Sequence, residues 1–188
     1  MEWNKYYESR VNSKTYDEYF STKYKSLIDL IVSHVKNDSS IIIIEEGCGI
    51  GSVTKQLLRY LPDNHYILLD KDNKMLALAK ENLKDFKDSN IQFFKKDILT
   101  PLSIISSCEK IVITHGVLEH FSDKNISKII NNYCKSNIIQ FHYVPIDGYS
   151  NPSFGDERLL SSDHWKKITK FQKHIIVNKQ DLYFQITN

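Results

Sequence analysis

The chain has 188 residues, of which 41% are hydrophobic and 26% charged, and its formal net charge is only +2. This length suits one domain with an ample core, and the small charge disfavours a nucleic-acid-binding surface. No apolar run is long enough to cross a membrane, and the N-terminus lacks the apolar segment of a secretory signal. We therefore expect a cytoplasmic protein with no membrane partner and no nucleic-acid partner. The oligomeric state stays open.

The N-terminal part, residues 1–36, is rich in aromatic side chains. From about Thr15 its apolar residues recur with a period near 3.6, which predicts one amphipathic helix that ends before Asn37. We expect this segment to form a helical, aromatic cap on an α/β core that spans residues 40–188. The whole chain, 1–188, is then a single domain.

Strand and helix signals alternate after residue 40. Buried strands are predicted at 41–44, 66–69, 91–94, 111–113 and 138–141, and helices at 52–58, 74–86, 122–134 and 161–168, with a short helix after Pro101. Two last strands, 171–177 and 182–186, are joined by four residues, so they pair antiparallel. The pattern predicts an α/β fold: one doubly wound, seven-stranded, mostly parallel sheet with a C-terminal antiparallel hairpin.

A glycine-rich corner follows the first strand, in the run Glu45-Glu46-Gly47-Cys48-Gly49-Ile50-Gly51. Glycines between a strand and a helix allow a tight turn and close approach to a nucleotide-like ligand. The two glutamates oppose a pyrophosphate, and Ser52 stands where a dinucleotide-binding loop needs its third glycine. Both features favour a ligand that carries positive charge.

This run resembles the E-x-G-x-G-x-G loop of class I S-adenosylmethionine-dependent methyltransferases of the small-molecule type. The segment Ile113–Phe121 also resembles the "v-L-E-H" stretch that follows the fourth strand in those enzymes. The resemblance implies a Rossmann-like methyltransferase fold with S-adenosylmethionine as cofactor. It places these residues at the cofactor: Glu45, Gly47, Cys48, Gly49, Gly51, Asp70 at the ribose, Lys71, Met75, Asp97 and Ile98 at the adenine, and His115 at the methionine end.

Candidate acceptor-side residues follow from the layout of the fold. His142, after the fifth predicted strand, is the candidate general base, although a structural role is as reasonable. We expect Tyr19, His120, Tyr143 and Arg158 to face the acceptor. His120 can instead fix its loop through a hydrogen bond, and Arg158 can instead pair with Asp156 or another surface acid.

The predicted activity is transfer of a methyl group from S-adenosylmethionine to the O or N atom of a small-molecule acceptor. Neither an Asn/Asp-Pro-Pro-Tyr/Phe motif nor a Pro-Cys pair follows the fourth strand, which argues against common nucleic-acid methylation. The three cysteines are scattered, and no metal site is predicted. Two alternatives remain: a catalytically silent S-adenosylmethionine-binding regulatory protein, and a nucleotide-dependent oxidoreductase.

Overall fold

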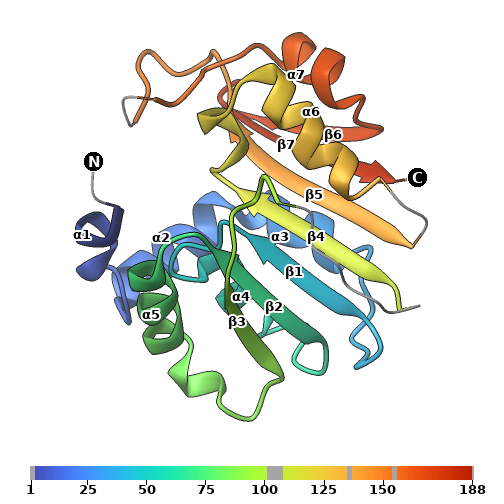
Figure 1. Ribbon diagram of the computed structural model, residues 1–188. Coiled ribbons are helices and arrows are strands. Elements are labelled where there is room, and N and C mark those ends of the chain that lie inside the picture. Colours follow the sequence, from blue (N-terminus) through green and yellow to red (C-terminus); the bar gives the residue numbers. More distant parts are fainter. Residues whose placement is uncertain (1–2, 101–107, 135–136, 154–155, 188) are drawn as a thin grey trace.

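The computed structural model describes residues 3–100, 108–134, 137–153 and 156–187. Seven strands form one sheet in the order β3-β2-β1-β4-β5-β7-β6 (Figure 1). Their bounds are β1 Ile42–Glu46, β2 His65–Asp70, β3 Ile91–Lys95, β4 Lys110–His115, β5 Ile138–Pro145, β6 Lys173–Val177 and β7 Asp181–Thr187. The first five strands are parallel, whereas β7 pairs antiparallel with both β5 and β6. The predicted mixed α/β sheet with its C-terminal antiparallel hairpin is confirmed.

Strand β1 lies at the centre of the parallel part, between β2 and β4, and all five of its residues are buried. Burial on both faces explains its run of isoleucines, because no side chain of this strand meets water. The chain winds outward from β1 to β3 and then returns to add β4 on the other side. Such a change of direction opens a crevice at the carboxyl ends of β1 and β4.

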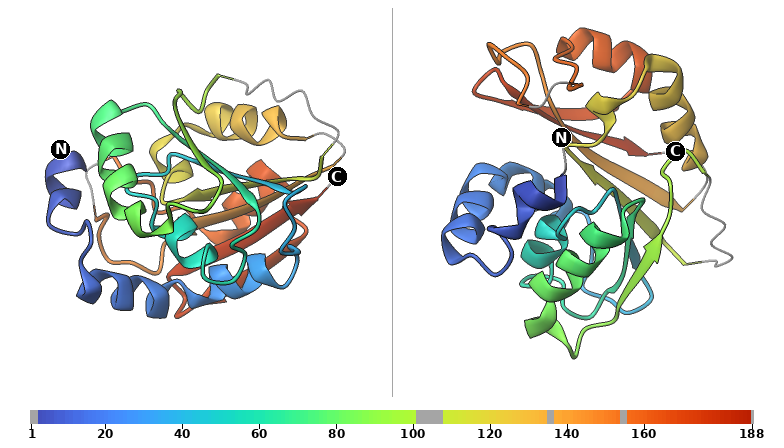
Figure 2. Two further views of the ribbon diagram at one scale, coloured as in Figure 1. Left: turned by 90° about the horizontal axis from the view of Figure 1, so that it is seen from below. Right: turned by 60° about the vertical axis from the view of Figure 1, so that its left-hand side comes forward.

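Helices cover both faces of the sheet, and Figure 2 shows α3 and α6 on opposite sides of it. One buried cluster joins α3, α4 and α5 to one face, and a second joins α6 and α7 to the other. The helical bounds are α1 Trp3–Glu8, α2 Lys14–Lys23, α3 Lys25–Val32, α4 Ser52–Leu57, α5 Asn73–Asn82, α6 Asp123–Asn132 and α7 Ser162–Thr169, with short 3₁₀ turns η1 Lys84–Phe86 and η2 Leu118–His120. Among the described residues, none of the helices is both long and apolar enough to cross a bilayer.

The prediction of a single helix from Thr15 is wrong, because the helix is interrupted at Tyr24. That residue has φ −102° and ψ 18°, and it ends α2 and precedes α3. The break lets the two helices point differently. Leu27 and Ile31 of α3 are fully buried against the sheet, whereas the aromatic residues of α2 are free to lie at the sheet's carboxyl edge.

Strand β5 is longer than its apolar run predicts. It continues through His142 and Tyr143 to Pro145, because the antiparallel partner β7 supplies ladder hydrogen bonds along that whole length. The short helix expected after Pro101 lies outside the described residues.

A buried ion pair attaches the N-terminal helices to the core. Lys55 Nζ of α4 lies 2.7 Å from Asp17 Oδ2 of α2, and their side chains are only 9% and 17% exposed. The same ammonium donates to Asn82 Oδ1 at 3.1 Å, and Asn82 Nδ2 donates to the Ile50 carbonyl at 2.9 Å. Asn12 N also donates to Asn82 Oδ1. The cap is therefore tied to the glycine corner through Asn82.

Replacing Asp17 by asparagine removes the charge that balances the buried Lys55. We expect Asp17→Asn to lower the free energy of unfolding by about 2–3 kcal/mol, since an unpaired buried cation is costly. Asp29→Asn is the matched control, because Asp29 pairs with Lys25 on the surface, and its loss should change little. Urea unfolding of the wild type and both variants measures this. Equal effects of the two substitutions would show that the Lys55 pair is not a stabilising attachment.

Candidate functional site

The glycine corner between β1 and α4 has a left-handed backbone that explains its composition. Gly47 has φ +66°, and a Cβ there would stand 2.8 Å from Cγ2 of Val117. Gly51 has φ +70°, and its Cβ would meet Leu83 and Leu68 at 3.0 and 3.1 Å. Only glycine tolerates both the positive φ and the close contact. The corner is thereby packed tightly against the segment after β4 and against α5.

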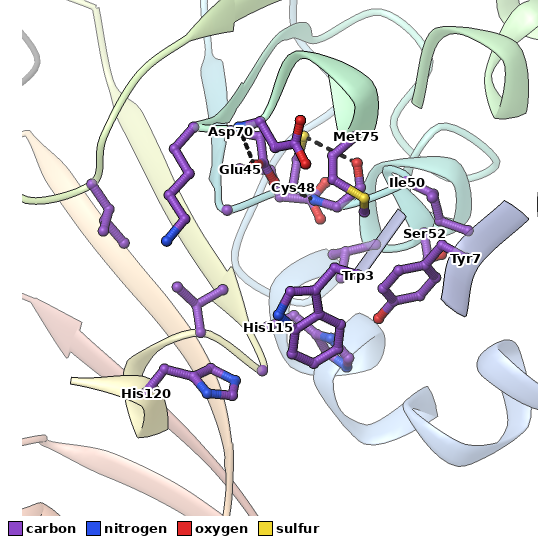
Figure 3. A pocket seen from close by; sticks show the side chains of 18 of the residues that line it. Trp3, Tyr7, Glu45, Cys48, Ile50, Ser52, Asp70, Met75, His115 and His120 are labelled. Atoms are coloured by element: carbon purple, nitrogen blue, oxygen red, sulfur yellow. Dashed lines mark hydrogen bonds between the residues drawn. The ribbon is translucent and has the colours of Figure 1, made fainter. Parts of the chain in front are cut away.

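A cavity of about 620 Å³ opens at the carboxyl edge of β1, β2 and β4, beside this corner (Figure 3). Its volume is within the range of small-molecule and cofactor sites. Most predicted cofactor residues line it: Glu45, Gly47, Cys48, Gly49, Asp70, Lys71, Met75, Asp97, Ile98 and His115. Gly51 does not line the cavity; its place is in the packing under the corner. The structure therefore brings ten of the eleven predicted cofactor residues together at one cavity.

Two carboxylates, those of Glu45 and Asp70, accept hydrogen bonds from residues in and next to the glycine corner. Glu45 is buried and accepts hydrogen bonds from Thr54 N at 3.1 Å and Thr54 Oγ1 at 2.5 Å. Burial raises the pKa of Glu45 to about 7, although the bonds from Thr54 act in the opposite direction. Asp70 Oδ2 accepts from Gly49 N at 3.1 Å, and its Oδ1 accepts from Asp72 N at 2.9 Å. Burial also raises the pKa of Asp70.

Glu46 departs from the expectation that both glutamates face the ligand. Adjacent residues of a strand point to opposite faces, and the Glu46 side chain lies on the face away from the cavity. There its Oε1 is 2.7 Å from Lys96 Nζ and accepts a hydrogen bond from the Tyr133 hydroxyl. The acidic pair is thus divided between two environments, and only Glu45 lines the cavity.

His115 ends β4 and enters the cavity next to the glycine corner. Its ring stacks on Tyr143 with 4.6 Å between centroids and meets the edge of Tyr24 at 4.2 Å. Burial lowers the pKa of His115 to about 3, so the imidazole is neutral at physiological pH. Its Nε2 is buried and has no hydrogen-bond partner within the described residues.

Aromatic side chains of the N-terminal helices form the opposite wall. They are Trp3, Tyr7, Tyr16 and Phe20. The Trp3 ring stacks on Tyr7 at 6.1 Å and meets the His120 ring edge-on at 5.7 Å. Sequence reasoning recognised the aromatic cap but selected Tyr19, which is 52% exposed and does not line the cavity. Helical spacing did not separate Tyr19 from Tyr16 and Phe20, because positions 16, 19 and 20 lie on one helix face and the Tyr16 and Tyr19 rings are 6.2 Å apart.

The other acceptor-side predictions have mixed outcomes. His120 lines the cavity, and its Nδ1 is 2.9 Å from Asp156 Oδ1, so it also has the loop-fixing hydrogen bond that was the alternative. Tyr143 lies buried behind His115 and donates to Asp181 Oδ1 at 2.8 Å. Arg158 does not reach the cavity. It is 2.7 Å from Asp123 Oδ1, which agrees with the expected pairing to a surface acid other than Asp156.

His142 does not stand where a general base is needed. It lies inside β5, is 1% exposed and does not line the cavity. Its Nδ1 bonds Thr114 Oγ1 at 2.8 Å and its Nε2 is 3.3 Å from Gln140 Oε1, while burial lowers its pKa to about 3. The prediction placed His142 after the strand because the apolar run ends at Phe141. The satisfied structural histidine is the role that the geometry supports.

A further group of polar residues borders the cavity and was not anticipated from sequence. Glu119 and His120 of η2 and Glu157 each bring a potential ligand atom within 4.8 Å of the others. Glu119 is 1% exposed, and burial raises its pKa to about 8. No spacing rule connects residues 37 or 38 positions apart, so only the folded chain reveals this group.

Comparison with known proteins shows which family the chain resembles. A family model described as "Methyltransferase domain" matches residues 43–136. The malonyl-[acyl-carrier protein] O-methyltransferase of Bacillus anthracis is 30% identical over 143 residues, which cover 73% of this chain and 47% of that protein. The chain thus spans about half the length of that curated relative.

Solved structures share the fold at low sequence identity. The PH0226 protein from Pyrococcus horikoshii superimposes with a TM-score of 0.73 at 15% identity, covering 96% of this chain and 97% of that one. Human N-acetylserotonin methyltransferase, solved in complex with S-adenosylmethionine, gives 0.66 at 14% identity over 92% of this chain and 54% of that one.

The raised pKa of Glu45 predicts a specific pH dependence of stability. The folded chain binds this proton up to about pH 7, whereas the unfolded chain releases it near 4.5. The stability that Glu45 contributes is therefore complete below pH 4.5 and is lost as the pH rises to 7, by about 3 kcal/mol. Glu45→Gln keeps an acceptor for Thr54 without the titration.

The measurement is the difference in free energy of unfolding between the wild type and Glu45→Gln from pH 4 to 8. We expect this difference to shift in favour of the variant as the pH rises. A constant difference across that range would mean that Glu45 titrates normally in the folded chain.

Proposed function

The chain belongs to the class I S-adenosylmethionine-dependent methyltransferases, and from this we propose that it transfers a methyl group from S-adenosylmethionine to an O or N atom of a small-molecule acceptor. The observation that carries the proposal is the glycine corner with Asp70 directly beside it at one cavity. The Gly49 N–H and the Asp70 carboxylate meet there at 3.1 Å.

The residues of the cavity fit this cofactor. Each oxygen of Asp70 accepts one backbone hydrogen bond and has a further lone pair for a ribose hydroxyl. Asp97 and Ile98, after β3, line the part of the cavity proposed for the adenine, and Met75 offers an apolar contact beside it. Gly47 and Gly49 bring the backbone close enough to hold the amino-acid part. His115, whose Nε2 has no hydrogen-bond partner among the described residues, lines the same cavity.

The charge of the lining favours a cationic ligand over a polyphosphate. Five carboxyl side chains face three lysines, namely Glu45, Asp70, Asp72, Asp97 and Asp156 against Lys71, Lys74 and Lys96. Lys96 is moreover paired with Glu46. A dinucleotide would place its pyrophosphate among these acids, at a cost in repulsion. This supports a sulfonium cofactor and opposes the oxidoreductase alternative.

When bound, S-adenosylmethionine supplies an electrophilic methyl group on its sulfonium. The role of the protein is to hold an acceptor atom in line with that methyl group, about 3–3.5 Å away, and to exclude water. Trp3, Tyr7 and Phe20 supply an apolar wall for this purpose, and His120 lies across from them. Because His142 does not line the cavity, the reaction that we propose depends on positioning and desolvation of the reactants.

The acceptor is proposed to be small because the wall opposite the cofactor residues is a confined aromatic surface. The curated relative from Bacillus anthracis is named for methylation of malonyl-[acyl-carrier protein], an O-acceptor. A catalytically silent binding protein would share the cavity but release no S-adenosylhomocysteine. Incubation with S-adenosylmethionine and a panel of hydroxyl, carboxyl and amine acceptors, followed by detection of S-adenosylhomocysteine, separates the two.

Asp70 provides the direct test of cofactor binding. We expect Asp70→Ala to weaken S-adenosylhomocysteine binding by about 1–3 kcal/mol, which is roughly 5- to 150-fold in Kd, because hydrogen bonds to a charged group are lost. Isothermal titration calorimetry measures this, with Asp88→Ala as the control, since Asp88 is exposed and outside the cavity. No heat from the folded wild type, or tight nicotinamide dinucleotide binding instead, would end the proposal.

A further inference from the structure

Three side chains at the border of the cavity have the composition of a metal site. Glu119 and His120 come from η2, and Glu157 comes from the loop after β5. One ligand atom from each lies within 4.8 Å of those of the other two. Two carboxylates and one imidazole suit divalent cations such as Mn²⁺, Co²⁺ and Zn²⁺.

The backbone holds the two segments side by side. Arg158 N donates to the Glu119 carbonyl at 3.1 Å, and the Arg158 guanidinium donates to the Phe121 carbonyl at 2.6 Å and to Asp123 Oδ1 at 2.7 Å. Three hydrogen bonds from one residue thus fix the loop along η2 and the start of α6. Because Glu157 directly precedes Arg158, this attachment places its carboxylate next to Glu119.

Glu119 is an independent sign of a missing ligand. Its side chain is 1% exposed, yet Oε2 has no hydrogen-bond partner in the described part of the chain. Buried carboxyl oxygens are normally satisfied, because an unpaired one costs free energy. The second acid, Glu157, lies close by. A divalent cation would satisfy both acids.

One ring nitrogen of the histidine already has a carboxylate partner. His120 Nδ1 is 2.9 Å from Asp156 Oδ1. A carboxylate on one ring nitrogen stabilises the tautomer in which the other nitrogen has a free lone pair, and metal-binding histidines usually have such a partner. Asp156 is therefore an outer partner of the group.

We propose that Glu119, His120 and Glu157 bind one divalent transition-metal cation at the border of the cavity. Ligand atoms around one such ion lie about 3 Å apart, so the side chains need to close inward by an ångström or two. Glu157 is half-buried and accepts a hydrogen bond from Ser153 N at 2.5 Å, and it is the less buried of the two acids. Three protein ligands leave the other coordination positions for water or for an exogenous oxygen.

The location of this ion would affect which acceptor the cavity can bind. His120 also lines the cavity, and its ring lies 5.7 Å from that of Trp3, so the proposed ion would lie beside the aromatic wall, where its open coordination positions could take an acceptor. An acceptor with oxygen donors, such as vicinal hydroxyls or a hydroxyl beside a carboxylate, could occupy them. This consequence rests on the proposed function, whereas the metal site itself does not.

Metal binding by the chelator-treated full chain tests the proposal. Free Mn²⁺ is followed by electron paramagnetic resonance, and Co²⁺ by its visible absorption. We expect one ion per chain, with Glu119→Gln and Glu157→Gln each weakening binding at least tenfold. Glu18→Gln is the matched control, because Glu18 is an exposed acid on α2 and its loss should leave binding unchanged.

Two results would overturn the site. One is no binding of either ion by the folded wild type, which would leave His120 and Asp156 as a hydrogen-bonded pair only. The other is binding that Glu119→Gln and Glu157→Gln do not alter, which would place the ion elsewhere. If Glu119→Gln does not fold by circular dichroism, Glu157→Gln decides alone, because Glu157 is less buried than Glu119.

Calorimetry with S-adenosylhomocysteine, in the presence and absence of Mn²⁺, separates this proposal from the proposed function. Cofactor binding by a chain that takes up no metal refutes the metal site and leaves the methyltransferase proposal intact. Metal uptake by a chain that gives no heat with S-adenosylhomocysteine supports the metal site and refutes the methyltransferase proposal.

Discussion

The left-handed turn at the glycine corner is the constraint on which the rest of the site depends. Gly47 and Gly51 both have positive φ, and both lie against side chains that a Cβ would strike. The corner is also tied to β2, since Cys48 N donates to the Leu69 carbonyl at 2.9 Å. The position of the backbone donors therefore follows from packing alone, before any ligand arrives, and that preorganisation lowers the cost of binding.

Burial divides the acids around this corner into groups with different tasks. Glu45 holds Thr54 at the start of α4, and Glu46 is neutralised by Lys96 on the other face. Asp70, Asp72 and Asp97 stand at strand ends and line the cavity. The negative character that favours a sulfonium thus comes mainly from the strand-end aspartates, rather than from the adjacent glutamates that first suggested it.

The sequence was sufficient wherever local rules decide the outcome. The mostly parallel sheet with its C-terminal antiparallel hairpin and the glycine corner follow from apolar runs, from chain connectivity and from residue types at strand ends. It was insufficient where the outcome depends on a partner distant in the chain. β7 extends β5 past His142, so that histidine is buried instead of facing a ligand. The group of Glu119, His120 and Glu157 forms only because Arg158 attaches its loop to η2.

The two walls of the cavity are mechanically connected. Lys55 of α4 bonds Asp17 of α2, and its second partner, Asn82, bonds the Ile50 carbonyl within the glycine corner. The same α2 carries Tyr16 and Phe20 into the aromatic wall. A displacement of the cap would therefore disturb the corner as well, because the Lys55 charge has no alternative partner among these contacts. Cofactor binding at the corner and the position of the aromatic wall are then expected to be coupled, since both depend on one buried ion pair.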